Sequence, residues 1–170
     1  MSIIKACVKK KLAYLLWFTG LSGSGKTTLA NTIYKKLKKL NFIVYRVDGD
    51  IFRKKNKNRN NFTKKNIINN NNKIISYVKK IDKKFDYIIV SVISPLLITR
   101  LKAKKIFGER YFEIYVKCGL RELFRRDTKG LYKKAREKKL HNLIGYNSKI
   151  KYEKSKYKKI IVDTEKLNIS

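Results

Sequence analysis

The stretch best suited to chemistry is "GLSGSGKT", Gly20–Thr27, which directly follows the apolar run "AYLLWFT". It matches G-x-x-x-x-G-K-[ST], a loop whose glycines let consecutive backbone N–H groups curl around a phosphate. In such a loop the lysine reaches the β- and γ-phosphates and the hydroxyl binds Mg²⁺. The sequence therefore predicts a site for ATP or GTP. The predicted nucleotide-binding residues are Gly20, Leu21, Ser22, Gly23, Ser24, Gly25, Lys26, Thr27 and Thr28.

Two aspartates follow a second apolar run, in "VDGDIFR". Ligands of parallel α/β sheets gather at the carboxyl ends of the strands, so we expect Asp48 and Asp50 beside the phosphate loop. Carboxylates next to a triphosphate hold a hydrated Mg²⁺ or accept a proton from an attacking hydroxyl. Thr27 and Asp48 are therefore the predicted metal-binding residues, although Asp and Gly are also common in solvated turns. Arg53 is a candidate clamp for an anionic acceptor.

The elements that must position these residues alternate along the chain. Continuous apolar or β-branched runs are typical of strands covered on both faces, and they lie at 13–19, 42–47, 86–93, 111–118 and 159–164. Helical stretches separate them at 26–40, 64–80, 96–105, 120–126 and 131–140. Strand–helix alternation predicts an α/β fold of the P-loop kinase type, with a parallel five-stranded sheet and helices on both faces.

Length and composition indicate one domain over residues 1–170 and a cytoplasmic location. The longest apolar stretch is about half of the roughly 18 residues that a membrane span needs. The basic-then-apolar N-terminus resembles a signal peptide, but no small-residue cleavage site follows it. Cys7 and Cys118 lie far apart and form no CxxC, so we expect reduced thiols rather than a disulfide or a zinc site.

The net charge of +32 raises the alternative of a nucleic-acid-binding surface. Of the 44 basic residues 35 are lysines, whereas arginine is the better bidentate ligand of phosphates and bases. Lys, Asn, Ile and Tyr share A/T-rich codons, so a biased genome explains the composition and nucleic acid is not the expected partner. Such charge still favours anionic substrates through long-range attraction.

Four motifs together resemble the adenylylsulfate kinases: "WFTGLSGSGKTTLA", "VDGDIFR", "ISP" and "RDTKGLYKKARE". The resemblance covers about Leu15 to Thr164, and the run "KGLYKKAR" is its most specific part. It implies an enzyme that uses ATP and Mg²⁺ to phosphorylate the ribose 3′-hydroxyl of adenylyl sulfate, giving 3′-phosphoadenylyl sulfate for sulfate assimilation. It also implies a possible homodimer and a functional coupling to ATP sulfurylase.

The resemblance assigns roles to individual residues. Asp48 matches a base or metal-side aspartate, Asp50 its partner, and Arg53 an arginine that contacts anionic groups of the acceptor. Phe62 matches an aromatic that stacks on the acceptor adenine. The remaining acceptor-binding residues that it implies are Asn70, Ile93, Ser94, Lys129, Gly130, Leu131 and Lys133.

Residues 126–145 match a basic lid over both nucleotides, with Arg126 near the ATP base. The catalytic residues implied are Lys26, Asp48 and Ser94, the serine as a phosphorylated intermediate. Direct in-line transfer needs no covalent step, so a serine next to Pro95 is explained equally well as a turn former.

Several positions depart from the family pattern. Ile67 occupies the position of an arginine that the family pattern expects. Either Lys64, Lys65 or Lys73 substitutes for that arginine, or Ile67 simply belongs to the buried face of a helix. An expected aromatic after the lid is Leu143, and a family helix after the last strand has no counterpart. Two alternatives remain open: a P-loop kinase of another small hydroxyl compound, and a basic nucleotide- or RNA-binding protein without phosphotransfer.

Overall fold

A computed structural model describes residues 12–55 and 63–166 of the chain. Its centre is a five-stranded sheet with the order β2-β3-β1-β4-β5, in which every neighbouring pair is parallel. The strands are β1 (Tyr14–Thr19), β2 (Val44–Asp48), β3 (Tyr87–Ser91), β4 (Tyr111–Lys117) and β5 (Ile160–Asp163). All five predicted strands are therefore confirmed, as is the parallel α/β sheet.

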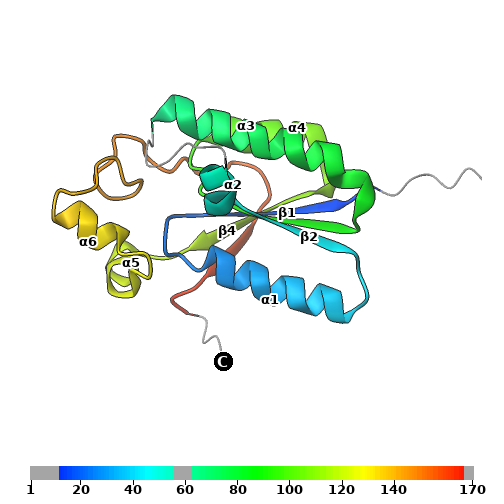
Figure 1. Cartoon of the computed structure of the whole chain (residues 1–170), viewed down its shortest axis with the longest axis horizontal. Helices are drawn as coiled ribbons and strands as arrows, with labels where there is room; N and C mark the ends of the chain where they lie inside the picture. The colour runs from blue at the N-terminus through cyan, green and yellow to red at the C-terminus, as the bar shows by residue number, and fades with distance from the viewer. Residues whose placement is uncertain (1–11, 56–62, 167–170) are drawn as a thin grey trace, which may run out of the picture.

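Helices cover both faces of this sheet (Figure 1). Helix α1 (Lys26–Lys39) lies on one face, and α3 (Lys64–Ile81) and α4 (Leu97–Phe107) lie side by side on the other. The remaining helices are α2 (Gly49–Lys55), α5 (Leu120–Arg126), α6 (Leu131–Arg136) and the short 3₁₀ turns η1 (Asp82–Lys84) and η2 (Gly108–Arg110). No helix in the described ranges is both long and apolar enough to cross a membrane.

The two faces of the sheet make two separate cores. Trp17, Ile88 and Val90 pack against α3 and α4, whereas Phe18 and Ile89 pack against Ala30 of α1 and its neighbours. Side chains of alternate strand residues point to opposite faces, so strands buried on both faces must be apolar at nearly every position. This requirement is why the strands were recognisable as continuous apolar runs.

The asparagine-rich α3 forms a helix despite a composition that favours turns. The Thr63 hydroxyl caps it by accepting a hydrogen bond from the backbone N–H of Asn66 at 3.3 Å. Ile74, Ile75 and Val78 then place a fully buried apolar face against the sheet. Capping and burial together outweigh the weak helix propensity of asparagine.

One helix was not predicted, and another prediction needs correction. The segment after Asp48, to which the sequence assigned no helix, forms α2. The helix predicted over 131–140 ends at Arg136, because Lys138 adopts a positive φ of 57°. The segment from Arg126 to Gly145 therefore contains the end of α5, the short helix α6 and a loop, and its function as a lid stays a prediction.

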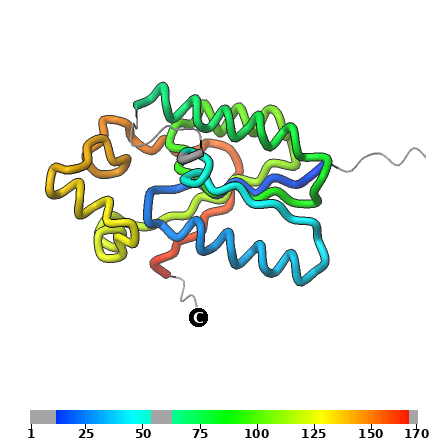
Figure 2. Tube along the Cα trace, viewed as in Figure 1, coloured from blue at the N-terminus to red at the C-terminus, as the bar shows by residue number. Residues whose placement is uncertain are grey.

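The topology brings the predicted chemistry to one edge of the sheet. The chain leaves β1, β2 and β3 at their carboxyl ends, and the segments that follow these strands meet there (Figure 2). Helices α5 and α6 lie beyond the same edge, in yellow in Figure 2. Residues that are distant in the sequence therefore line one cleft, as expected for open α/β sheets.

Ile67 lies on the buried face of α3. It is 5% exposed and packs with Leu96 and Ile144, with Ile93 of the predicted acceptor wall partly buried against the same cluster. Of the two interpretations of this position, the structure favours the buried apolar contact over a vacant anion clamp.

The substitution Ile67→Arg tests this packing. We expect it to lower the free energy of unfolding by about 3 kcal/mol or more, because a buried guanidinium would lack a partner. Urea denaturation measures the change, and Ile98→Arg is the matched control because Ile98 is 64% exposed on α4. The contrary result is equal stability of the two variants together with a lower KM of Ile67→Arg for an anionic acceptor. That result would favour an anion clamp at position 67 and, with it, the acceptor contact predicted for Asn70.

Candidate active site

A cleft of about 260 Å³ opens at the carboxyl edge of the sheet. It is bounded by the phosphate loop, the ends of β2 and β3, and the segment after α5. Its lining residues are Ser22, Gly23, Gly25, Lys26, Thr27, Thr28, Asp48, Asp50, Ser91, Val92, Ile93, Arg126, Thr128 and Lys129. The cleft thus brings together most of the predicted ATP-binding residues and part of the predicted acceptor wall, whereas Gly20, Leu21 and Ser24 lie outside its lining.

The phosphate loop can curl only because glycine occupies its first position. Gly20 has φ of 147°, and a Cβ there would lie 2.4 Å from the backbone oxygen of Val116. Loop carbonyls are bound by distant residues: the Tyr132 hydroxyl donates to Ser22 O at 3.0 Å, and Thr164 Oγ1 donates to Ser24 O at 3.1 Å. With these carbonyls occupied, the loop can present its amides to an anion.

Lys26 begins α1 and is nearly buried, at 8% exposure. Its Nζ donates to the backbone oxygen of Leu21 at 2.6 Å. Burial, followed by repulsion from Lys129, lowers the pKa of Lys26 to about 8. A cation held in this way is destabilised until an anion enters the loop.

Asp48 ends β2 and connects three parts of the site. Its Oδ1 accepts the backbone N–H of Asp50 at 2.9 Å, which fixes the start of α2. Its Oδ2 accepts the Thr27 hydroxyl at 3.2 Å and lies 3.5 Å from the Ser91 hydroxyl. The Asp48 carboxylate and the Thr27 hydroxyl are hard oxygen donors of the kind that Mg²⁺ takes alongside substrate phosphates. The residues present therefore fit the predicted metal.

Asp50 forms an ion pair with Lys129, which joins the segment after β2 to the segment after α5. Burial would raise the pKa of Asp50, but the hydrogen bond and charge of Lys129, together with the charge of Arg53, lower it below its ordinary value. Burial lowers the pKa of Arg53, and the charge of Asp50 opposes that shift. Asp50 and Lys129 therefore lie together on one side of the cleft, whereas Arg53 interacts with Asp50 but is outside the cleft lining.

Arg126 lines the cleft and is held from two sides. Its guanidinium donates to Thr164 Oγ1 at 3.1 Å and to Thr164 O at 2.8 Å, and its Nε donates to Glu122 at 2.7 Å. Hydrogen bonds from Arg125 and Arg126 lower the pKa of Glu122 to about 2, so the carboxylate stays charged. Arg126 is thereby fixed next to the phosphate loop before any nucleotide binds.

Ser94 does not lie where a catalytic serine would. Its side chain is fully buried, and its hydroxyl lies 3.0 Å from Thr99 Oγ1. Thr99 Oγ1 in turn donates to Leu96 O at 2.9 Å, so Ser94 is the donor to Thr99. The hydroxyl points into the turn before α4 and does not line the cleft. This placement argues against a nucleophilic Ser94.

The other predicted acceptor residues are divided. Ile93 and Lys129 line the cleft, whereas Asn70 is buried on α3 and the lid residues Gly130, Leu131 and Lys133 lie outside the lining. Phe62 falls outside the described residues. Leu143 is 2% exposed and packs with Leu123 of α5 and Tyr132 of α6.

Several site residues were not predicted. Thr128, Ser91 and Val92 line the cleft, and Thr164 and Tyr132 hold the phosphate loop from behind. Ser91 and Val92 could have been found from the strand pattern, since Ser91 ends β3 at the carboxyl edge and Val92 follows it directly. The contact of Thr164 with Ser24 joins residues 140 positions apart and has no local signal.

Comparison with known proteins agrees with this geometry. The family model for adenylylsulphate kinase matches residues 12–163. The chain belongs to the adenylylsulphate kinase family. A relative from Archaeoglobus fulgidus, described as a probable adenylyl-sulfate kinase, is 35% identical over 91% of this chain and 98% of its own length. An adenylyl-sulfate kinase of Clostridium acetobutylicum is 35% identical over 92% of this chain and 78% of its own length.

A solved structure has the same fold over nearly the whole chain. It is the Mycobacterium tuberculosis APS kinase CysC in complex with AMPPNP and APS, with a TM-score of 0.82 and 28% identity. The match covers 92% of this chain and 91% of that chain. The prediction of a P-loop kinase that transfers phosphate to a hydroxyl acceptor is therefore confirmed.

The depressed pKa of Lys26 predicts how ATP binding depends on pH. Below about pH 8 the free protein holds Lys26 charged, whereas above it the lysine must take up a proton to pair with ATP. We expect the Kd for ATP to rise with pH above about 8, by up to about tenfold per pH unit. Calorimetry from pH 7 to 9.5 measures this, and Lys26→Met, neutral throughout, is the control. The same rise in that variant would assign the titration to another group.

The buried position of Ser94 predicts that Ser94→Ala keeps its activity. We expect a turnover number within about threefold of wild type and a loss of about 1 kcal/mol in the free energy of unfolding, from one hydrogen bond. Ser91→Ala is the comparison, because that serine lies on the cleft. Complete loss of turnover in folded Ser94→Ala would restore the covalent intermediate.

Proposed function

We propose that this chain transfers the γ-phosphoryl group of ATP to the ribose 3′-hydroxyl of adenylyl sulfate. The P–O bond to the β-phosphate breaks, a new bond to the ribose oxygen forms, and the products are ADP and 3′-phosphoadenylyl sulfate. The observation that supports this most is one cleft in which Lys26 and Thr27 face Asp48, with Ile93 and Lys129 on the adjoining wall. Family membership supports the choice of acceptor.

Mg²⁺ is the cofactor that we propose, held by the Thr27 hydroxyl and the Asp48 carboxylate. When bound, it neutralises charge on the β- and γ-phosphates. Lys26 supplies a further positive charge beside the transferring group, and such fixed charges stabilise a phosphoryl transition state. Asp48 can also accept the proton of the attacking hydroxyl, because its carboxylate already lies at the phosphate loop.

Cations for the anionic groups of the acceptor lie across the cleft from the phosphate loop. Lys129 is paired with Asp50 and is half-exposed, so a sulfate or phosphate can replace that carboxylate as its partner. Arg53 lies beside the same aspartate and supplies a second positive charge. Ion pairs at exposed positions are weak, so exchanging one partner for another costs little.

The wider setting of the enzyme stays a proposal. Homodimer formation, coupling to ATP sulfurylase, a cytoplasmic location and a role in sulfate assimilation are expected from the family resemblance. The alternatives, a kinase of another small hydroxyl compound and a basic nucleotide- or RNA-binding protein, predict different outcomes in one assay. That assay measures ADP formed from Mg·ATP with a panel of acceptors. We expect ADP with adenylyl sulfate and not with sugars or shikimate; the opposite pattern, or no ADP, would contradict the proposal.

Asp48→Asn tests the role of the carboxylate in transfer. We expect kcat to fall by about 10²- to 10⁴-fold with the fold retained, because the amide keeps the shape and loses the charge. Asp86→Asn is the matched control: its carboxylate also accepts a backbone N–H, that of Ile43, at 2.8 Å, but at the opposite end of the sheet. A change confined to the KM values would make Asp48 a binding residue.

A further inference from the structure

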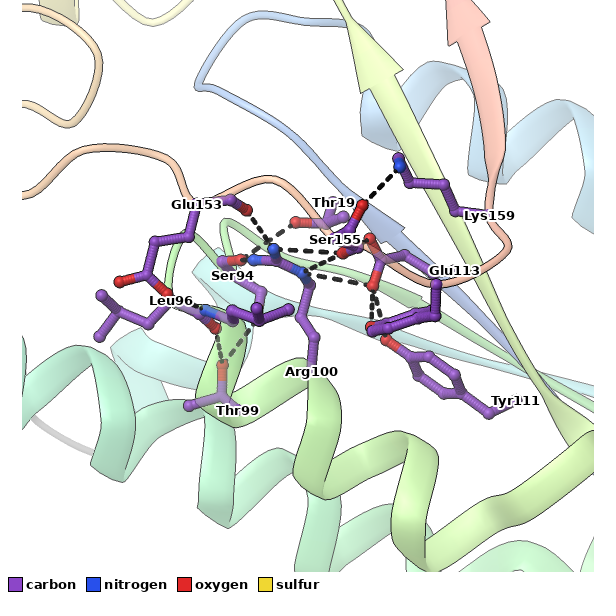
Figure 3. A network of polar contacts seen from close by, with 12 residues as sticks. Thr19, Ser94, Leu96, Thr99, Arg100, Tyr111, Glu113, Glu153, Ser155 and Lys159 are labelled. Atoms are coloured by element: carbon purple, nitrogen blue, oxygen red, sulfur yellow. Dashed lines mark hydrogen bonds and ion pairs between the residues drawn. The ribbon is translucent and has the colours of Figure 1, made fainter.

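A charged pair lies in the interior beside the acceptor wall (Figure 3). Arg100 of α4 is fully buried, and its Nε lies 3.3 Å from the Oε2 of Glu113, which is 3% exposed on β4. Removing two charges from water costs more than their attraction returns unless further hydrogen bonds satisfy them. The hydrogen-bond partners of Arg100 and Glu113 therefore show which parts of the structure the pair holds in place.

The carboxylate side of the pair is satisfied by hydroxyl groups. Ser155 donates to one oxygen of Glu113, and Tyr157 donates to the other. The Tyr111 hydroxyl lies at 3.5 Å from that second oxygen. These contacts join β4 to the coil before β5, and none of them reaches the cleft.

The guanidinium side of the pair contacts Ser155 Oγ and two backbone carbonyls, one of them next to the acceptor wall. Arg100 donates to the carbonyl of Ser94 and to the carbonyl of Glu153 (Figure 3). The Ser94 carbonyl also lies 3.4 Å from the Thr19 hydroxyl, which donates to it. Because Ile93 lines the cleft and directly precedes Ser94, the position of this carbonyl sets the position of the wall.

The same group is connected to the phosphate loop. Arg100 lies over the ring of Tyr152, with 4.9 Å between the guanidinium carbon and the ring centroid. The Tyr152 hydroxyl is 2.9 Å from Thr19 Oγ1. Thr19 is the last residue of β1 and directly precedes Gly20, the first glycine of the loop. Donor and acceptor sides of the cleft thus meet at Arg100 and its contacts.

We infer that Arg100 is a positioning residue that fixes the acceptor wall, through the Ser94 carbonyl, against the start of the phosphate loop. The inference rests on the proposed function, since it takes Ile93 to face the acceptor. A buried ion pair is by itself weak evidence for a role in stability, because apolar residues of similar volume often replace such a pair without loss. The phosphate loop has its own supports in Tyr132 and Thr164, so loss of Arg100 should spare ATP binding.

Arg100→Lys is the test variant, because lysine keeps the charge beside Glu113 and loses the planar fork that serves two carbonyls. Tyr157→Phe is the matched control, since it removes a hydrogen bond of the same cluster without touching Ser94 or Thr19. The double variant Arg100→Met with Glu113→Met removes both charges and serves if the lysine variant fails to fold. For each protein we would measure the melting temperature, the kinetic constants for both substrates, and amide hydrogen exchange over residues 92–97.

We expect Arg100→Lys and the double variant to lose about 10- to 100-fold in kcat/KM for adenylyl sulfate, as a small misplacement of reacting groups does. The KM for ATP should change less than about twofold, and Tyr157→Phe should keep both sets of constants. Exchange over residues 92–97 should accelerate in the Arg100 variants only.

Three results would overturn the inference. The first is wild-type kinetics in a folded Arg100 variant, and the second is an equal loss for ATP and adenylyl sulfate. The third is failure of both Arg100 variants to fold, which would make the pair a requirement of the fold itself. Absence of ADP formation by the wild-type protein would contradict the proposed function instead, and the exchange comparison would still decide whether Arg100 fixes the wall.

Discussion

The site depends on the orientation of the peptide groups in the phosphate loop. A peptide has a positive end and a negative end, so a loop that binds phosphate must turn its carbonyls toward protein donors. Tyr132 and Thr164 supply such donors to the carbonyls of Ser22 and Ser24. Burial raises the pKa of Tyr132 to about 12, which keeps its hydroxyl protonated as a donor at neutral pH.

The need to bind the loop carbonyls explains why segments distant in the sequence contact the eight residues of the phosphate loop, Gly20–Thr27. Tyr132 belongs to the run "KGLYKKAR", the most specific family motif, and Thr164 follows the last strand. Each is far from the loop in sequence and in contact with it in the fold. Cations around the loop are held in the same way: Lys26 contacts the Leu21 carbonyl, and Arg126 contacts Thr164. The protein thus supplies hydrogen-bond partners that hold these cations beside the loop before a nucleotide binds.

The elements and the donor half of the site could be predicted from the sequence because their signals are local. Apolar runs defined the strands, and the spacing from Gly20 to Thr27 defined the loop. Helix α2 was missed because Asp and Gly are ordinary turn residues. The early end of α6 depends on a positive φ at Lys138, which the sequence does not predict because lysine rarely adopts that conformation.

The acceptor half was harder to predict because its geometry depends on contacts between distant residues. Whether Ile67 was a missing clamp or a core residue was decided by its packing with Leu96 and Ile144. Ser94 was predicted to be catalytic, but its hydroxyl is turned toward Thr99, while its carbonyl is held by Arg100. No pattern in the sequence relates an arginine on α4 to that carbonyl.

The most direct test of this account follows the transferred phosphorus in one turnover. The wild-type protein, in excess, is mixed with Mg·ATP labelled at the γ-phosphorus and with adenylyl sulfate, and the reaction is quenched over time. The account predicts that the label passes straight to the nucleotide acceptor, with the phosphate at the ribose 3′ position by NMR and none on the protein at any time. Label on the protein, at another ribose position or only in inorganic phosphate would contradict it.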